Sequence, residues 1–135
     1  MTKLEWTEAH RIGVPAIDED HQRILRTVDA FIESSMERKS TSHPVEHLLE
    51  LMRCAYYHFR LEERLMQQTG FPDVARHAAK HDELFESLLG YLRGYLKFGT
   101  CDAVEVGDFL THWFAEHLLD ADQAYKAHFH AHGIR

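Results

Sequence analysis

The chain has 135 residues, of which 44% are hydrophobic and 27% are charged. This balance is typical of one soluble globular domain and excludes a disordered or collagen-like chain. Acidic residues outnumber basic ones by 22 to 15, which argues against nucleic acid as a partner. No apolar stretch reaches the length of a membrane span, so we expect no stable membrane insertion, and the charged N-terminus predicts a cytoplasmic protein.

Residues 1–17 lack helical periodicity and are expected to form an extended N-terminal arm that packs against the rest of the domain. Gly13 and Pro15 lie in this arm. After it, apolar residues recur at intervals of three and four, which is the period of an α-helix. We therefore predict an all-α protein whose first helix runs over about 18–38.

Further helices are predicted over about 43–68, 73–98 and 102–121. Pro44 stands in the first turn of the second helix, after a capping residue at 42 or 43. Asp73 is the expected N-cap of the third helix, and Gly99 follows its end. The fourth begins at Asp102 with the spacing of a capping box. A shorter C-terminal helical segment containing Tyr125 is expected after it.

Four helices joined by short connections favour an up-down-up-down antiparallel four-helix bundle, because short connections make consecutive helices neighbours. The sequence shows no internal repeat or linker, so we treat residues 1–135 as a single domain. Nothing in the apolar pattern demands a partner helix, and we expect a monomer.

Histidine is the unusual feature of the composition, with 12 residues in 135, and it is the commonest metal ligand. His58 with Glu62, and His77 with His81, stand one helical turn apart, so each pair can point at one centre. In an up-down-up-down bundle the starts of odd helices and the ends of even ones share one end. The same layer therefore also receives His21 from the first helix and His117 from the fourth.

Five imidazoles and two carboxylates exceed the four ligands of a structural zinc site, so this layer predicts two metal ions. Imidazole suits iron, zinc, copper and nickel, and ligand type alone leaves the metal open. The second carboxylate also stays open. Asp120 lies about 60° from His117 around a straight helix and Asp122 about 140°, so Asp122 requires the helix to end, loosen or carry a π-bulge.

These residues and their spacing resemble the hemerythrins, particularly the single-domain bacterial hemerythrins. The resemblance covers essentially the whole chain, and its matching segments are residues 18–21, 58–63, 77–81 and 117–122, with Trp6 and Gly13-Val14 in the arm. It implies two non-haem iron ions per chain with a bridging oxo or hydroxo group. By resemblance one iron is held by His77, His81 and His117, the other by His21 and His58, and both are bridged by Glu62 and Asp122. The family pattern thus selects Asp122 over Asp120.

The resemblance also implies a non-enzymatic function: reversible binding of dioxygen, for oxygen storage, transport or delivery, at an open position on the iron with two histidines. Its partners would be dioxygen and an oxygen-consuming enzyme as recipient. Trp113 and Phe114, one turn before His117, are expected to line the oxygen pocket, and relatives commonly have leucine in place of Phe114. The alternatives are oxygen or redox sensing, or a diiron enzyme that handles peroxide or nitric oxide.

The remaining histidines receive a structural interpretation. Surface, capping or ligand-supporting positions are expected for His10, His43, His47 and His112, and a solvated tail for His128, His130 and His132. Glu63 is expected to face solvent or to support a ligand. Cys54 and Cys101 belong to no metal or catalytic motif and are expected to be plain thiols.

Overall fold

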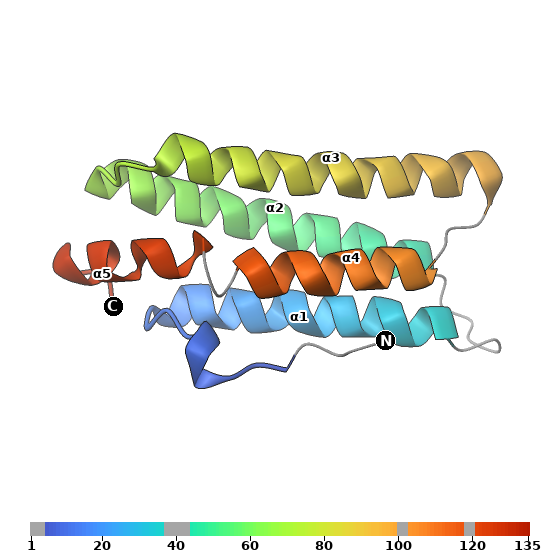
Figure 1. Cartoon of the computed structure of the whole chain (residues 1–135), viewed down its shortest axis with the longest axis horizontal. Helices are drawn as coiled ribbons and strands as arrows, with labels where there is room; N and C mark the ends of the chain where they lie inside the picture. Colours follow the sequence, from blue (N-terminus) through green and yellow to red (C-terminus); the bar gives the residue numbers. More distant parts are fainter. Residues whose placement is uncertain (1–4, 37–43, 100–102, 118–120) are drawn as a thin grey trace.

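The protein is described by a computed structural model that covers residues 5–36, 44–99, 103–117 and 121–135. Its elements are η1 (Glu8–His10), α1 (Pro15–Met36), α2 (Pro44–Thr69), α3 (Val74–Phe98), α4 (Ala103–Glu116) and α5 (Gln123–Ala131). The four long helices run alternately up and down, and α5 continues beyond the end of α4 (Figure 1). Helix α1 packs against α2 and α4, while α2 also packs against α3 and α5. The predicted all-α bundle with a short C-terminal helix is confirmed.

The first helix begins at Pro15 and not near Asp18, so the expected boundary of the arm was wrong by three residues. Proline suits the first helical position because its fixed φ is helical and its missing N–H is not needed there. The N–H of Asp18 already bonds to the Val14 carbonyl at 3.0 Å. The Asp18 carboxylate in turn accepts the N–H groups of Ile12 and Gly13 at 2.8 and 3.0 Å, which ties the arm to the helix start.

The ends of α3 are partly as expected. Asp73 occupies the N-cap position, but its side chain makes no capping hydrogen bond. Gly99 ends the helix in the left-handed region, with φ of 75°, and its N–H bonds to the Tyr95 carbonyl at 2.7 Å. The expected caps of α2 at 42 or 43 and of α4 at Asp102 lie outside the described residues, as does Cys101.

The fourth helix was expected to run to about residue 121. The α-helical part, α4, ends at Glu116, residues 117 and 121 are π-helical, and 118–120 lie outside the described residues. The backbone N–H of Asp122 donates to the carbonyl of His117, five residues earlier, at 2.8 Å. This is the hydrogen bond of a π-turn. Helix α5 follows it and is no solvated tail, because Tyr125 and Phe129 are both fully buried.

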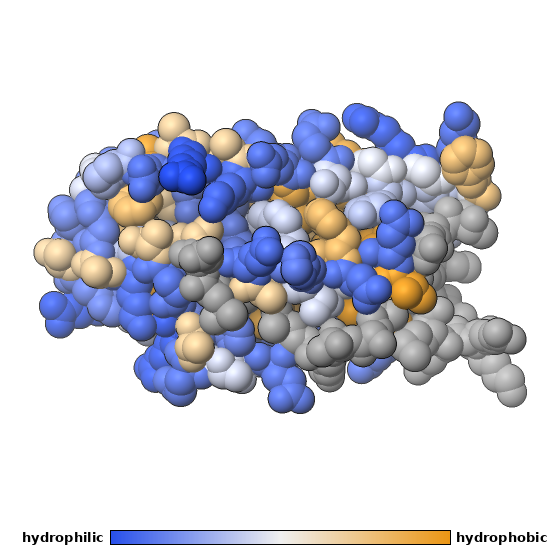
Figure 2. All heavy atoms as spheres, in the orientation of Figure 1, coloured by the Kyte–Doolittle hydropathy of each residue, from blue (hydrophilic) through white to orange (hydrophobic). Residues whose placement is uncertain are grey.

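The apolar core has two parts. The larger part fills the space between the four long helices, with Phe31, Leu51, Leu84 and Leu110 among its buried members. The smaller part joins the arm, the end of α2 and α5 through Ile12, Val14, Ile17, Met66, Phe71, Tyr125 and Phe129. The face shown in Figure 2 is mostly hydrophilic, with apolar side chains scattered over it. Among the described residues, no helix is long and apolar enough to cross a membrane.

Candidate metal centre

The structure brings together all seven residues that the sequence singled out as metal ligands. They form two groups of potential donors that share Glu62, and the donor atoms within each group lie within 4.8 Å of one another. The larger group contains Glu62, His77, His81, His117 and Asp122, and the smaller contains His21, His58 and Glu62. Every member is buried.

Each helix of the bundle delivers donors to this layer, as the topology predicts. The pairs His58 and Glu62 on α2 and His77 and His81 on α3 each lie one turn apart, which aims both side chains of a pair inward. His21 comes from the second turn of α1.

The π-turn decides which acid completes the centre. The hydrogen bond from the Asp122 N–H to the His117 carbonyl inserts one residue into the helical repeat. As a result the Asp122 carboxylate lies 2.8 Å from His117 Nε2 and 3.1 Å from both His77 Nε2 and His21 Nε2. Asp120 lies outside the described residues.

Glu62 lies between the two groups. Its Oε1 is 3.0 Å from His21 Nε2 and 2.5 Å from His58 Nε2, whereas its Oε2 is 3.1 Å from His77 Nε2 and 3.3 Å from His81 Nε2. One oxygen therefore faces each group of histidines. This is the arrangement that a carboxylate needs to bridge two cations.

The donor set fits metal ions better than it fits a hydrogen-bond network. Both oxygens of Asp122 are buried and lack a hydrogen-bond partner of acceptable geometry, although imidazole nitrogens lie about as close as hydrogen-bond partners would. His81 Nε2 and His117 Nε2 also approach to 3.2 Å. Buried polar atoms without a hydrogen-bond partner need another explanation, and one such explanation is an ion that they bind. The residues present thus fit two cations.

Two carboxylates outside the donor set hold ligand histidines in place. Asp20 Oδ2 contacts His58 Nδ1 at 2.9 Å, and Glu63 Oε2 contacts His81 Nδ1 at 3.1 Å. Carboxylates on the outer nitrogen of a histidine fix its orientation and raise its basicity as a ligand. The sequence suggested a supporting role for Glu63 but missed Asp20, although Asp20 directly precedes His21.

Tyr125 was also missed as part of the site. Its hydroxyl donates to Glu62 Oε1 at 2.9 Å, and the side chain is fully buried. The spacing could have predicted this role, because Tyr125 follows Asp122 by three residues and therefore lies on nearly the same face of the helix. Helix α5 therefore contacts the centre through two residues: Asp122, which precedes the helix, and Tyr125, in its first turn.

Aromatic rings pack against two of the ligand imidazoles. Phe59 stacks on His81 with ring centroids 3.7 Å apart, and Trp113 stacks on His117 at 4.4 Å. Trp113 is half-buried and lines a surface groove that reaches His117. Phe114 is buried in the core of the bundle beside Trp113, with ring centroids 5.1 Å apart. Trp113 thus contacts the ligand His117 directly, whereas Phe114 contacts Trp113 from the core of the bundle.

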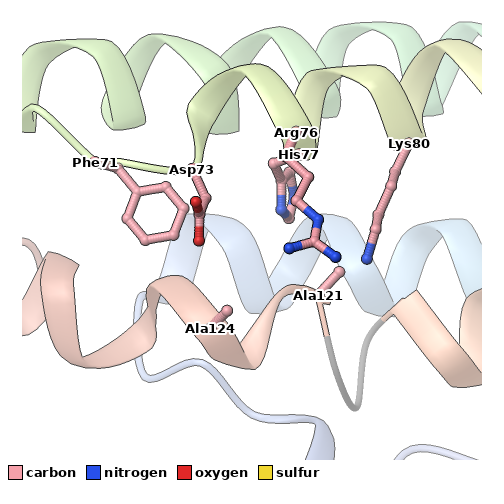
Figure 3. A pocket seen from close by; sticks show the side chains of 7 residues that line it. All are labelled: Phe71, Asp73, Arg76, His77, Lys80, Ala121 and Ala124. Atoms are coloured by element: carbon pink, nitrogen blue, oxygen red, sulfur yellow. The ribbon is translucent and has the colours of Figure 1, made fainter.

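A second groove, of about 240 Å³, approaches the centre from the side of α3. Its lining residues are Phe71, Asp73, Arg76, His77, Lys80, Ala121 and Ala124. Figure 3 shows the side chains of Arg76 and Lys80 reaching from α3 toward Ala121, with the His77 ring beside Arg76. His77 is both a lining residue of this groove and a member of the larger donor group.

In the metal-free protein the carboxylates keep protons on the imidazoles. Burial opposes a charged His21, but Asp122 and Glu62 outweigh it and raise the pKa of His21 to about 10. The same carboxylates overcome burial at His77 and raise its pKa to about 9. Burial also works against ionised carboxyls, yet the surrounding histidines hold the pKa of Glu62 and that of Asp122 well below the usual range. A metal must displace these protons to bind.

The other histidines differ in part from their expected roles. His112 is exposed beside Glu116 at 3.1 Å, as expected for the surface, and His43 lies outside the described residues. The solvated tail predicted for His128 and His130 was wrong. His128 Nε2 bonds to the carbonyl and hydroxyl of Thr69 at 3.1 and 3.0 Å, and the His130 ring packs over Gly13. Both are held because Tyr125 and Phe129 anchor α5 in the core.

Comparison with known proteins places the chain in a family. A family profile described as "Hemerythrin HHE cation binding domain" matches residues 12–129. A bacteriohemerythrin of Stenotrophomonas maltophilia (strain R551-3) is 28% identical over 134 residues, which cover 98% of this chain and 85% of that protein. A hemerythrin-like protein of Naegleria gruberi is 27% identical over 123 residues, which cover 91% of either chain.

Solved structures share the fold of this chain. A crystal structure described as a leucine-to-phenylalanine mutant has a TM-score of 0.85 and 25% identity, and the match covers 94% of this chain and 97% of that one. A crystal structure of wild-type hemerythrin has a TM-score of 0.83 at 23% identity over 93% and 97% of the two chains, a likeness that shows the fold. Because the family profile spans residues 12–129 of the same bundle that carries the buried donors, the chain belongs to the hemerythrin HHE family.

Proposed function

We propose that this protein binds dioxygen reversibly at a centre of two non-haem iron ions and serves in oxygen storage, transport or delivery. The observation that carries the proposal is the buried set of five imidazoles and two carboxylates, divided into two groups that share Glu62. Family membership favours iron among the metals that imidazole and carboxylate suit.

The unequal donor groups support binding of a small ligand on one side. His77, His81 and His117 join Glu62 and Asp122 in the larger group, whereas the smaller has only two histidines beside Glu62. A metal ion held by the smaller group would have fewer protein ligands and so a free position, which is the feature of a reactive rather than a structural site. Dioxygen is small enough to enter so closely packed a bundle.

The protein's own residues have three tasks in this proposal. The carboxylates of Asp20 and Glu63 keep His58 and His81 oriented, and the hydroxyl of Tyr125 holds one oxygen of Glu62. Burial of the whole donor set keeps bulk water away from the ligands. When bound, the two ferrous ions would supply the electrons that dioxygen binding requires.

Trp113 and Phe114 are proposed to shape the route of dioxygen. Trp113 covers His117 through stacked rings and borders the groove at that ligand. Phe114 fills the core next to it. The two aromatic rings thus lie between this groove and the core of the bundle, and their proposed role is to limit how fast dioxygen exchanges with solvent.

We further propose that the protein is a carrier and not an enzyme. The charged side chains that contact the ligands, Asp20 and Glu63, each contact the outer nitrogen of a histidine and so have a positioning role. An oxygen-consuming enzyme would be the recipient of the dioxygen that the protein carries.

The test is an anaerobic optical titration of the reduced, iron-loaded protein with dioxygen. The proposal predicts two irons per chain and an oxygen-dependent charge-transfer spectrum that disappears when the gas is removed. Irreversible oxidation at the first exposure, or sustained turnover with peroxide or nitric oxide, would favour a sensor or an enzyme instead.

A further inference from the structure

Two buried imidazole nitrogens near the smaller donor group lack a hydrogen-bond partner. They are Nδ1 of His21, on α1, and Nε2 of His10, at the end of η1 in the N-terminal arm. The side chains are 2% and 4% exposed. A buried polar group without a partner costs on the order of 1–3 kcal/mol, so native proteins satisfy such groups with protein or with ordered water.

The two rings share one neighbour. Trp6 lies with its ring centroid 5.5 Å from that of His10 and 6.4 Å from that of His21. Trp6 therefore packs beside both imidazoles.

The position of that proton follows from the contacts of His10. The backbone N–H of Thr7 donates to His10 Nδ1 at 2.9 Å. Because Nδ1 accepts this hydrogen bond, it carries no proton, and the ring proton lies on Nε2, the nitrogen without a partner.

The same reasoning applies to His21. Its Nε2 faces the carboxylates of Glu62 and Asp122 at 3.0 and 3.1 Å and is the nitrogen available to a metal. A neutral histidine that binds metal through Nε2 carries its proton on Nδ1. His10 and His21 thus each present an unsatisfied N–H donor, and two donors cannot bond to each other.

His21 also differs from the other ligand of the smaller group. His58 has Asp20 on its outer nitrogen, as His81 has Glu63 in the larger group. Ligand histidines almost always donate their outer N–H to a carboxylate, a carbonyl or a water. For His21 the described residues provide none of these.

We propose that one buried water molecule accepts hydrogen bonds from His10 Nε2 and His21 Nδ1, and that His10 is thereby a positioning residue for His21. A water oxygen has two lone pairs and matches two N–H donors. The arm would then contribute to the centre through His10 as well as covering it. This inference rests on the proposed metal function, because it assigns the Nε2 lone pair of His21 to a metal.

Two substitutions of His10 separate this role from simple packing of the arm. In asparagine the side-chain oxygen can replace Nδ1 as the acceptor for the Thr7 N–H, but the side chain is too short to place a donor where Nε2 lies. In glutamine the side-chain NH₂ group can replace Nε2 as the donor. His10→Gln should therefore keep the bond to the water and His10→Asn should lose it. His112→Asn changes an exposed histidine and is the matched control.

The first readout is the affinity for the second iron, which is the one held by the smaller donor group. The second readout is the set of exchangeable N–H signals of the ligand histidines, which the bound iron shifts in the proton NMR spectrum of the reduced protein. His10→Asn should weaken the second iron about tenfold or more, the size typical for loss of an outer partner, and should shift or broaden one ligand N–H signal. His10→Gln and His112→Asn should match the parent protein. A crystal structure of the iron-loaded protein should show the water within about 3 Å of both nitrogens.

Equal loss in His10→Asn and His10→Gln would show that His10 only packs the arm, and it would overturn the inference. The inference would also be overturned if His10→Asn left the iron affinity and the N–H signals unchanged, or if the crystal structure lacked the water. Parent protein that fails to bind two irons would instead overturn the proposed function, so the two failures are distinguishable.

Discussion

The backbone N–H of Asp122 donates to the carbonyl of His117 at 2.8 Å, across five residues in place of the usual four. Through this single bond the Asp122 carboxylate comes to lie against His117, His77 and His21. The π-turn therefore joins the end of α4 to the metal centre.

The π-turn makes a direct prediction about the two neighbouring acids. Asp122→Asn should weaken iron binding at least tenfold, because a neutral amide is a poor ligand and leaves the surrounding imidazoles without their counter-charge. Asp120→Asn should leave the iron content unchanged. Iron per chain after anaerobic loading and desalting distinguishes the two variants, and equal loss in both would contradict the geometry described above.

Tyr125→Phe tests the hydrogen bond to Glu62. Removing a donor to a buried carboxylate should lower the free energy of unfolding of the metal-free protein by about 1.5–3 kcal/mol. Tyr57 is 65% exposed, and Tyr57→Phe should change stability by no more than about 0.5 kcal/mol. Urea denaturation of both variants provides the measurement. Similar midpoints for the two variants would mean that the Tyr125 hydroxyl contributes nothing to the centre.

Gly13→Ala should disrupt the contact between the arm and α5. Gly13 has a φ of 83°, and a Cβ there would stand 3.0 Å from the His130 ring. Gly70 is the matched control, since its φ is 70° but no atom lies within 4 Å of its added Cβ. Both substitutions carry the left-handed penalty of about 1–2 kcal/mol, and Gly13→Ala should cost about 1–3 kcal/mol more from overpacking. Equal thermal shifts would show that His130 yields freely.

Iron binding should release protons. His21 and His77 are protonated at pH 7 in the metal-free protein, because their pKa values are raised to about 10 and about 9. Ligation requires neutral imidazole, so loading should release at least two protons and affinity should rise as the pH increases toward these values. Calorimetry in buffers of different ionisation enthalpy measures the release. A binding enthalpy that is independent of the buffer would contradict it.

Phe114→Leu tests the proposed oxygen route. The smaller side chain leaves free volume beside Trp113, so the association and dissociation rates of dioxygen should both increase, at a stability cost of about 1 kcal/mol. Phe109→Leu alters a half-buried aromatic on the same helix, where it packs against Tyr91. Stopped-flow and flash-photolysis rates for the two variants are the measurement. Unchanged rates in Phe114→Leu would exclude this residue from the route.

Much of the centre could be predicted because it depends on local spacing and simple topology. The pairs His58 and Glu62, and His77 and His81, follow from a period of 3.6 residues within one helix. The shared depth of His21 and His117 follows from alternating helix directions, which short connections impose.

The parts that could not be predicted depend on contacts distant in the sequence. A straight helix favours Asp120, and the π-turn forms where Asp122 is drawn among imidazoles from α1 and α3. The alternating histidines near the C-terminus looked solvated, yet Tyr125 and Phe129 bury α5 against residues of the arm. The early start of α1 was missed because residues 15–17 are too few to show a period.

If the two donor groups hold two iron ions, anomalous diffraction at the iron absorption edge should locate both of them. Crystals of the anaerobically loaded protein should give two anomalous peaks in each chain. One should lie among the Nε2 atoms of His77, His81 and His117, and the other beside those of His21 and His58. A single peak, or iron bound away from Glu62, would mean that the two donor groups do not form a diiron centre.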